Sequence, residues 1–249
     1  MTFEIVTIFP RTIEAGLSEG VVARAVGQGV IDVRVHDLRT FTTDRHRTVD
    51  DMPYGGGPGM VMKPEPFVKA VDHIRSTGGE PEAVVLLSPR GQVFTQVEAR
   101  RLSRLDRVVL LCGRYEGIDE RVRELVATEE LSIGDFVVSG GELPALLVVD
   151  AVSRLVPGVV GDEQSVVQDS FSRGLLDYPH YTRPPSFGGV AVPDVLLSGH
   201  HAQVERWRRT AALRGTLRTR PELLEEADLD DEDRAILEQL KKETEDERH

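Results

Sequence analysis

Three stretches rich in glycine and proline follow short apolar runs in the amino-terminal half of the chain. They read LLSPRG at 86–91, CGRYEG at 112–117 and LSIGDFVVSGG at 131–141. Glycine lets a backbone approach a ligand closely, and strands of an open α/β sheet leave backbone groups free at their carboxyl ends. Each stretch taken alone is more simply a tight turn into a helix. Three at one sheet edge together predict a site for a nucleotide-like ligand.

The usual phosphate-binding motifs are absent from the sequence. No Gly-x-Gly-x-x-Gly joins a strand to a helix, and no Gly-x4-Gly-Lys-Ser/Thr occurs. The run YGGGPGM at 54–60 lacks the lysine and hydroxyl of an ATP-binding loop, so we expect its glycines to let the loop pack closely against another segment. A nicotinamide-dependent dehydrogenase and an ATPase are therefore both disfavoured.

Alternating apolar runs and helical patterns predict the elements that position these stretches. We expect strands at 3–9, 31–38, 83–87 and 108–112, and helices at 10–26, 96–105, 118–126 and 142–156. The continuous apolar runs at 83–87 and 108–112 are typical of strands covered by helices on both faces. The pattern predicts an α/β domain with a mostly parallel sheet.

The pattern changes after Pro157. Residues 158–168 have no helical periodicity, which predicts a linker or a mobile loop. Chain rich in proline and glycine follows, and then two helical segments at 200–213 and 221–242. We expect a small, mostly helical second domain from about residue 170, with residues 241–249 frayed and solvated.

Composition narrows the class of protein. The chain has 249 residues, 40% hydrophobic and 29% charged, which is an ordinary globular balance. No apolar run is long enough to cross a membrane, and no basic segment precedes the first apolar run, so we expect a cytoplasmic protein. The single cysteine, Cys112, excludes internal disulfides and a Cys-rich zinc site.

The net charge of -12 is unevenly distributed. Residues 222–249 carry 13 acidic and 4 basic side chains, whereas residues 199–221 carry six arginines and one acidic residue, Glu205. Charges act over about 10 Å in salt, so the local field decides whether a polyanion binds. The acidic total therefore does not argue against a nucleic-acid partner.

Four longer strings resemble one known family. They are CGRYEGIDERV at 112–122, SIGDFVVSGGELPA at 132–145, HRTVDDMPYGGGPGM at 46–60 and DSFSRGLLDYPHYTRP at 169–184. These strings resemble the bacterial tRNA (guanine-37-N1)-methyltransferases, the TrmD family of the SPOUT superfamily. The resemblance runs from Phe3 to about Leu224 and leaves the acidic tail after about Asp228 unexplained.

The resemblance implies a fold, a reaction and partners. The fold would be a SPOUT-type, mostly parallel sheet with a deep trefoil knot, in an obligate homodimer whose active sites lie at the subunit interface. Residues 1–160 would form the methyltransferase domain that binds S-adenosylmethionine, 161–169 a flexible loop, and 170–249 a helical tRNA-binding domain with an acidic tail. The protein would methylate N1 of guanine 37 in tRNA, next to the anticodon.

The resemblance also assigns residues to the methyl donor. The expected donor-binding residues are Leu87, Ser88, Pro89, Gly113, Glu116, Ile133, Gly134, Asp135, Phe136, Val137, Val138, Gly140 and Gly141. The apolar members suit adenine, which needs an apolar slot with backbone hydrogen-bond partners. Glu116 would face the methionine end or a metal, although a solvated loop carboxylate is an equal alternative from the sequence alone.

Two residues are implied in catalysis. Guanine N1 carries a proton at neutral pH, and Asp169 would remove it. Arg154 would stabilise the negative charge that then develops on guanine O6. From the residues alone, Asp169 fits a turn or helix cap and Arg154 a solvated helix end, so both roles rest on the resemblance.

Further residues are implied in RNA binding. They are Ser170, Arg183, Arg206, Arg208 and Arg209, which would contact phosphates and exposed bases. A run of arginines is more often a solvated helix face, and the single tryptophan, Trp207, is more simply core packing than a stacking platform. The loop at 160–168 would close as a lid over the target.

No ligand spacing in the sequence indicates a metal site, so a magnesium requirement is an expectation from the family alone. Two other functions stay open. One is a SPOUT enzyme that modifies a different RNA nucleoside. The other is an idle RNA-binding paralogue, which the presence of Asp169 and Arg154 disfavours.

Overall fold

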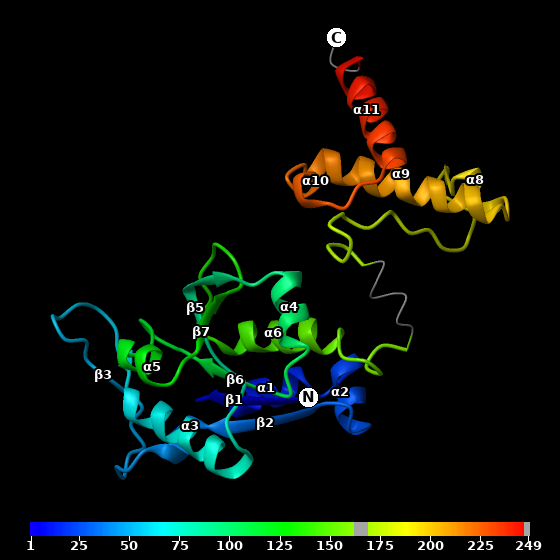
Figure 1. Ribbon diagram of the computed structural model, residues 1–249. Helices are drawn as coiled ribbons and strands as arrows, with labels where there is room; N and C mark the ends of the chain where they lie inside the picture. The colour runs from blue at the N-terminus through cyan, green and yellow to red at the C-terminus, as the bar shows by residue number, and fades with distance from the viewer. Residues whose placement is uncertain (162–168, 247–249) are drawn as a thin grey trace. The chain divides into compact units, whose positions relative to one another are not determined.

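A five-stranded parallel sheet organises the amino-terminal part of the chain (Figure 1). Its strands lie in the order β2-β1-β6-β5-β7, and every neighbouring pair is parallel. The strands are β1 (Thr2–Thr7), β2 (Asp32–Asp37), β5 (Ala83–Val93), β6 (Arg107–Cys112) and β7 (Glu129–Ser132). The prediction of an α/β fold with a mostly parallel sheet is confirmed.

The structure, a computed structural model, describes residues 1–161 and 169–246. The chain divides into two compact units, Met1–Glu163 and Gln164–His249. We refer to them as unit 1 and unit 2. Most of the predicted linker at 158–168, and of the predicted lid at 160–168, lies outside the described residues.

Helices cover both faces of the sheet. In β1 the side chains of Phe3 and Ile5 pack on one face and Val6 on the other, and all six residues of β6 are buried. The first face is covered by α1 (Pro10–Gly16), α2 (Gly20–Gly27), α4 (Gln96–Leu102) and α6 (Glu142–Ser153). The second is covered by η1 (Leu38–Phe41), α3 (Pro64–Gly78) and α5 (Glu120–Leu125).

The helices of unit 1 differ from the prediction at two places. The helix expected at 10–26 is wrong, because the chain leaves the helical path between α1 and α2. There the hydroxyl of Ser18 donates to the carbonyl of Ala15 at 2.8 Å, a local bond that competes with helix continuation. The sequence analysis also misses α3, which begins with Pro64 at its first turn and buries Phe67, Val71 and Ile74.

The glycine-rich run at 54–60 joins a short hairpin of β3 (Asp50–Asp51) and β4 (Val61–Met62). Its last glycine, Gly59, has φ +80°, and a Cβ there would lie 2.3 Å from the Glu116 carboxylate. The Glu116 amide donates to the Met60 carbonyl at 3.0 Å. The expectation that this loop packs closely against another segment is therefore confirmed at Gly59.

Unit 2 begins with irregular chain and continues into helices. A hairpin of β8 (Ser186–Phe187) and β9 (Val190–Ala191) precedes the helices α8 (Asp194–Leu197), α9 (His201–Thr219), α10 (Leu223–Glu226) and α11 (Asp231–Asp246). Its core contains the buried side chains of Leu175, Leu213, Leu237 and Leu240. The core joins α9 to α11.

The prediction of one helix over residues 221–242 in unit 2 is wrong. Residues 221–242 form two helices, and α11 continues to Asp246 where frayed chain was expected from 241. A reciprocal cap starts α11: the Asp233 amide donates to the Asp230 carboxylate at 2.8 Å, and the Asp230 amide donates to the Asp233 carboxylate at 3.2 Å. Such a cap satisfies the free amides of a first helical turn.

A buried ion pair ties three strands together. Glu4 of β1 is 1% exposed, and its carboxylate accepts hydrogen bonds from Arg107 of β6 at 2.5 and 3.0 Å. Its other oxygen lies 2.6 Å from Nε2 of His36 in β2. Burial by itself raises the pKa of Glu4, but the hydrogen bonds to His36 and Arg107 outweigh it and hold the pKa below its ordinary value of 4.5.

We predict that Arg107→Ala lowers the free energy of unfolding by about 3 kcal/mol at pH 7, because the buried carboxylate loses the cation that donates two hydrogen bonds to it and keeps only the more distant Arg34, at 3.4 Å, as an arginine partner. A lowered carboxyl pKa stabilises the fold above pH 4.5, and this contribution disappears as the pH falls through the pKa of the folded state. In Glu4→Gln, the free energy of unfolding should therefore decrease less steeply with falling pH below pH 4.5 than in the wild type. Urea unfolding from pH 3 to 7 checks both expectations.

The matched control is Glu65→Gln, since Glu65 forms an exposed pair with Lys69 at 2.7 Å. Its midpoint of unfolding at pH 7 should stay close to that of the wild type. Equal acid sensitivity of Glu4→Gln and the wild type would contradict the assigned role of Glu4.

Candidate functional site

One cavity of about 370 Å³ opens at the carboxyl edge of the sheet in unit 1. Its walls come from the three glycine- and proline-rich stretches identified in the sequence. The volume lies in the range of small-ligand sites. The prediction that the three stretches meet at one edge is therefore confirmed.

The first stretch differs from the expected loop. LLSPRG lies inside β5, where the pairing with β7 shifts: Leu87 and Gln92 both face Leu131. The residues between them form a bulge instead of a turn into a helix. Bulges redirect side chains locally, and this one brings Ser88, Pro89 and Arg90 to the cavity wall.

The structure brings most of the predicted donor-binding residues together. Those that line the cavity are Leu87, Ser88, Pro89, Gly113, Glu116, Ile133, Phe136, Val137, Val138, Gly140 and Gly141. Gly134 and Asp135 are absent from this lining. Gly134 shapes the loop instead, since its amide donates to the Ser132 hydroxyl at 3.2 Å and its carbonyl accepts from the Phe136 amide at 2.9 Å.

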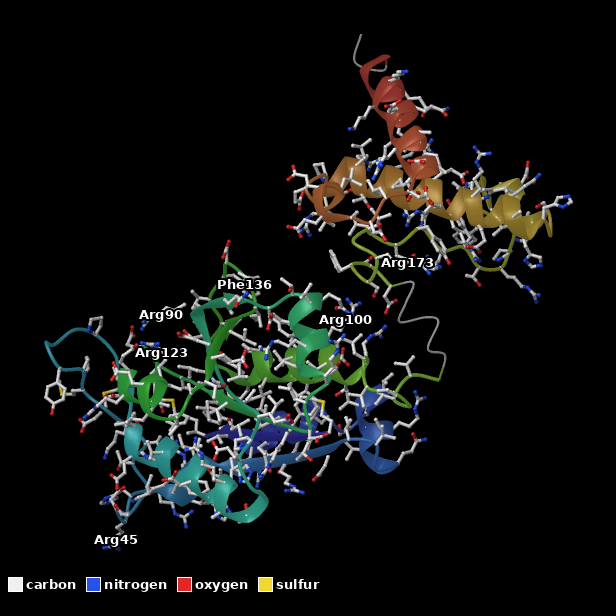
Figure 2. All side chains as sticks on the ribbon, viewed as in Figure 1. Arg45, Arg90, Arg100, Arg123, Phe136 and Arg173 are labelled. Carbon is white, nitrogen blue, oxygen red and sulfur yellow. The ribbon has the colours of Figure 1, made fainter. Side chains whose placement is uncertain are left out.

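The cavity has an apolar side and a charged rim. Phe136 and Val137 are 55% and 83% exposed, so their apolar surface is open to a ligand. Arg90 and Arg123 lie near each other at the same edge of unit 1 as Phe136 (Figure 2). Both arginines bind the carboxylate of Glu120, and the hydrogen bonds from Arg123 and then Arg90 lower its pKa.

A buried carboxylate binds Arg114, one of the residues that line the cavity. Glu142 begins α6, is 1% exposed, and accepts from the Thr7 hydroxyl at 2.6 Å and from Nε of Arg114 at 2.8 Å. Arg114 also donates to the Ser139 carbonyl at 3.1 Å, and its guanidinium lies 4.6 Å from the centre of the Phe9 ring. We name Glu142, Arg114 and Thr7 the anchor network.

The sequence analysis misses the anchor network. Arg114 and Glu142 stand in the strings CGRYEG and GGELPA, next to the cavity glycines, and this proximity was the available signal. The neighbouring thiol of Cys112 is fully buried, and burial followed by the charge of Glu142 raises its pKa well above the ordinary value. A thiol in that environment stays protonated and is a poor nucleophile.

The two predicted catalytic residues belong to different units. Arg154 ends α6 in unit 1, where its amide donates to the Asp150 carbonyl at 3.1 Å. Asp169 is the first described residue of unit 2, and its carbonyl accepts from the Ser172 amide at 3.1 Å. Their predicted roles stay predictions.

Most of the predicted RNA-binding residues have protein partners in unit 2. The hydroxyl of Ser170 accepts from the Asp177 amide at 2.9 Å. Arg209 binds both oxygens of Asp233, at 2.7 and 2.5 Å, and Arg206 lies 3.3 Å from Glu232. Arg208 donates to Glu205 at 2.6 Å. The exposed side chain of Arg183 has no ion pair within residues 169–246.

The described residues contain neither a cluster suited to a metal ion nor a helix suited to crossing a membrane. No group of three or more His, Cys, Asp or Glu side chains in residues 1–161 and 169–246 is placed to hold a metal ion. Among the helices of the same residues, none combines the length and apolarity that crossing a membrane requires.

We predict that Gly141→Ala lowers the free energy of unfolding of unit 1 by about 2 kcal/mol through overpacking. A Cβ at Gly141 would lie 2.6 Å from the Cα of Cys112 and 3.0 Å from the Gly113 amide nitrogen, so two backbones would have to separate. The control is Gly27→Ala, where a Cβ meets nothing within 4 Å. Urea unfolding of the three proteins measures the difference, and equal stability of Gly141→Ala and Gly27→Ala would contradict the close approach.

Comparison with known proteins places the chain in a family. A family model described as tRNA (Guanine-1)-methyltransferase TrmD matches residues 1–226. Proteins named tRNA (guanine-N(1)-)-methyltransferase from Geobacter metallireducens and Pelotomaculum thermopropionicum are 54% and 53% identical over 241 residues, which is 96% of this chain and 98% and 96% of theirs. The protein of that name from Dictyoglomus turgidum is 51% identical over 243 residues, 98% of each chain. This chain belongs to the TrmD family of tRNA (guanine-N1)-methyltransferases.

Proposed function

We propose that this protein transfers the methyl group of S-adenosylmethionine to N1 of guanine 37 in tRNA, in the cytoplasm. The observation that carries the proposal is the match to the TrmD family over residues 1–226, together with identities near 50% across almost the whole chain. The three-walled cavity in unit 1 supports it, because its size suits a nucleoside-containing donor.

The residues of the cavity fit such a donor. Ile133, Phe136 and Val138 supply the apolar surface that adenine needs, and the adjacent backbone supplies hydrogen-bond partners. Glu116 contributes a carboxylate to the same lining, a suitable partner for an ammonium group. When bound, the donor supplies an electrophilic methyl group on a sulfonium.

Asp169 acts as the general base in this proposal. Its carboxylate takes the proton from guanine N1, and the N1 electron pair forms the new bond to the methyl carbon. The carbon–sulfur bond breaks at the same time, so its electrons stay on sulfur and S-adenosylhomocysteine leaves. Arg154 stabilises the negative charge that develops on guanine O6.

A homodimer would supply the complete site. Leu143 and Leu147 are one turn apart on α6 and are 58% and 45% exposed, and Phe9 is 43% exposed. Exposed apolar side chains on one helix face support burial against another subunit. We propose the domain bounds 1–160 and 170–249, with the active site formed by residues of both subunits.

The proposed trefoil knot concerns the chain path around β5. β6 lies between β1 and β5, β7 lies beyond β5, and α6, which follows β7, packs against β1 and β6. The chain thus crosses the sheet and returns over a short stretch. This order supports a knotted path, which is rare among proteins.

The direct test is transfer of radiolabelled methyl groups from S-adenosylmethionine to tRNA transcripts that carry guanine or adenine at position 37. We expect incorporation only with guanine 37, and nuclease digestion should identify the product as 1-methylguanosine. Methylation of another nucleoside would point to a different RNA methyltransferase, and tRNA binding without transfer would point to an idle RNA-binding protein.

We predict that Asp169→Asn lowers kcat at least a hundredfold, because the amide cannot accept the N1 proton. Affinity for tRNA and S-adenosylhomocysteine should change less than threefold. The control is Asp194→Asn, an exposed carboxylate in the first turn of α8. Single-turnover methyl transfer measures the rates, and a fully active Asp169→Asn would remove this residue as the base.

A further inference from the structure

Residues 177–185 run along α9 in unit 2 and enclose two cavities of about 810 and 560 Å³. The cavities adjoin each other, since they share four lining residues, Tyr178, Pro179, Tyr181 and Trp207. We name the two cavities together the aromatic groove. It is distinct from the donor cavity, which is lined by unit 1 alone.

Aromatic rings form the floor of the groove. The centres of the Tyr181 and Trp207 rings lie 6.2 Å apart at an angle of 60°, and those of Tyr178 and His180 lie 4.7 Å apart. Tyr181 is 47% exposed and Trp207 is partly exposed, which corrects the expectation that Trp207 packs in the core. Ring faces open to solvent can stack on unpaired nucleobases.

The charge around the rings is positive. The arginines that line the groove are Arg183, Arg208, Arg214 and Arg218, and Asp177 is the single carboxylate in the lining. Asp177 is already bound to His180 at 2.8 Å. Within residues 169–246, the side chains of Arg183 and Arg218 have no ion pair or hydrogen bond. Arg208 pairs with Glu205 at 2.6 Å and Arg214 with Glu243 at 3.5 Å, although Nε of Arg208 is buried without an acceptor.

The opposite face of α9 is neutralised. There α11 supplies Asp233 to Arg209 and Glu232 to Arg206. Asp233 is nearly buried, and its hydrogen bonds with Arg209 lower its pKa. The acidic helix also reaches one groove arginine, since Glu243 lies 3.5 Å from Arg214. Arg183 and Arg218 are the groove arginines whose side chains have no partner within residues 169–246.

We propose that the aromatic groove binds an unpaired nucleotide of the tRNA substrate, with the base stacked on Tyr181 and the adjacent phosphates bound by Arg183 and Arg218. The inference rests on the proposed function for its RNA substrate. Exposed rings interleaved with unpaired arginines are the combination that single-stranded nucleic acid needs, and arginine also stacks on bases. A protein partner is the competing occupant that the test must distinguish.

Trp207 makes the groove directly observable, because it is the only tryptophan in the chain. We expect its fluorescence to fall as full-length protein is titrated with a tRNA transcript or a 12-nucleotide single-stranded RNA. A 12-base-pair RNA duplex of the same sequence should change it much less. The Kd from fluorescence should match the Kd from filter binding.

Tyr181→Ala should weaken tRNA binding about tenfold, whereas Tyr181→Phe, which keeps the ring, should stay within twofold of the wild type. The control is Phe187→Ala, an aromatic side chain of the same unit that is 81% exposed outside the groove. Circular dichroism confirms that each variant is folded before binding is compared. If Tyr181→Ala unfolds, the Trp207 fluorescence titration of the wild-type protein decides the test.

Salt dependence tests the arginines separately. Arg218→Gln should lower the slope of log Kd against log salt concentration by about 1, because one phosphate contact is lost. Arg234→Gln should leave the slope unchanged, since Arg234 pairs with Asp231 within α11 and does not line the groove.

The inference is overturned if saturating tRNA leaves Trp207 fluorescence unchanged, or if Tyr181→Ala binds tRNA as tightly as Phe187→Ala. It is also overturned if the fluorescence responds to protein concentration without RNA, which would identify a protein interface. If the wild-type protein methylates guanine N1 and Tyr181→Ala binds tRNA normally, the groove proposal fails and the proposed function stands. If the wild-type protein binds RNA in the groove but does not methylate N1, the proposed function fails and the groove proposal stands.

Discussion

The carboxylate of Glu142 is the point on which the cavity in unit 1 depends. It is buried at the first turn of α6, where the helix dipole favours a negative charge, and it binds Thr7 at the end of β1 and Arg114 after β6. Arg114 extends the connection to Ser139 in the third wall. Removing one partner of a buried ion pair costs about 3–5 kcal/mol. The network therefore connects the end of β1, the segment after β6 and the third wall of the cavity through one buried charge.

The sequence predicts much of this fold because its signals are local. The runs at 83–87 and 108–112 are apolar at every position, and the structure buries them on both faces. The bulge in β5 has no such signal, since it depends on pairing with a strand forty residues away. The break after α1 coincides with a hydrogen bond from the Ser18 hydroxyl. The spacing of apolar residues, from which the helix was predicted, contains no information about this bond.

The candidate site likewise has a part that local sequence signals predict and a part that they do not. Glycines at the ends of apolar runs predicted the walls of the cavity in unit 1, because close approach of backbones restricts those positions to glycine. Asp169 and Arg154 carry no comparable signal, since a turn carboxylate and a helix-end arginine are common in any protein. Their roles come from the resemblance to TrmD proteins. In unit 2 the net charge is a poor guide, because acidic residues of α11 pair with Arg206, Arg209 and Arg214 of α9, whereas the side chain of Arg218 has no partner among the described residues.

Calorimetric titration with S-adenosylhomocysteine is the most direct test of the anchor network. Glu142→Gln removes the charge that holds Arg114 but keeps the size of the side chain. The account predicts binding at least tenfold weaker than in the wild type, with the circular dichroism spectrum unchanged. A Kd equal to that of the wild type would contradict the claim that this buried carboxylate organises the cavity in unit 1.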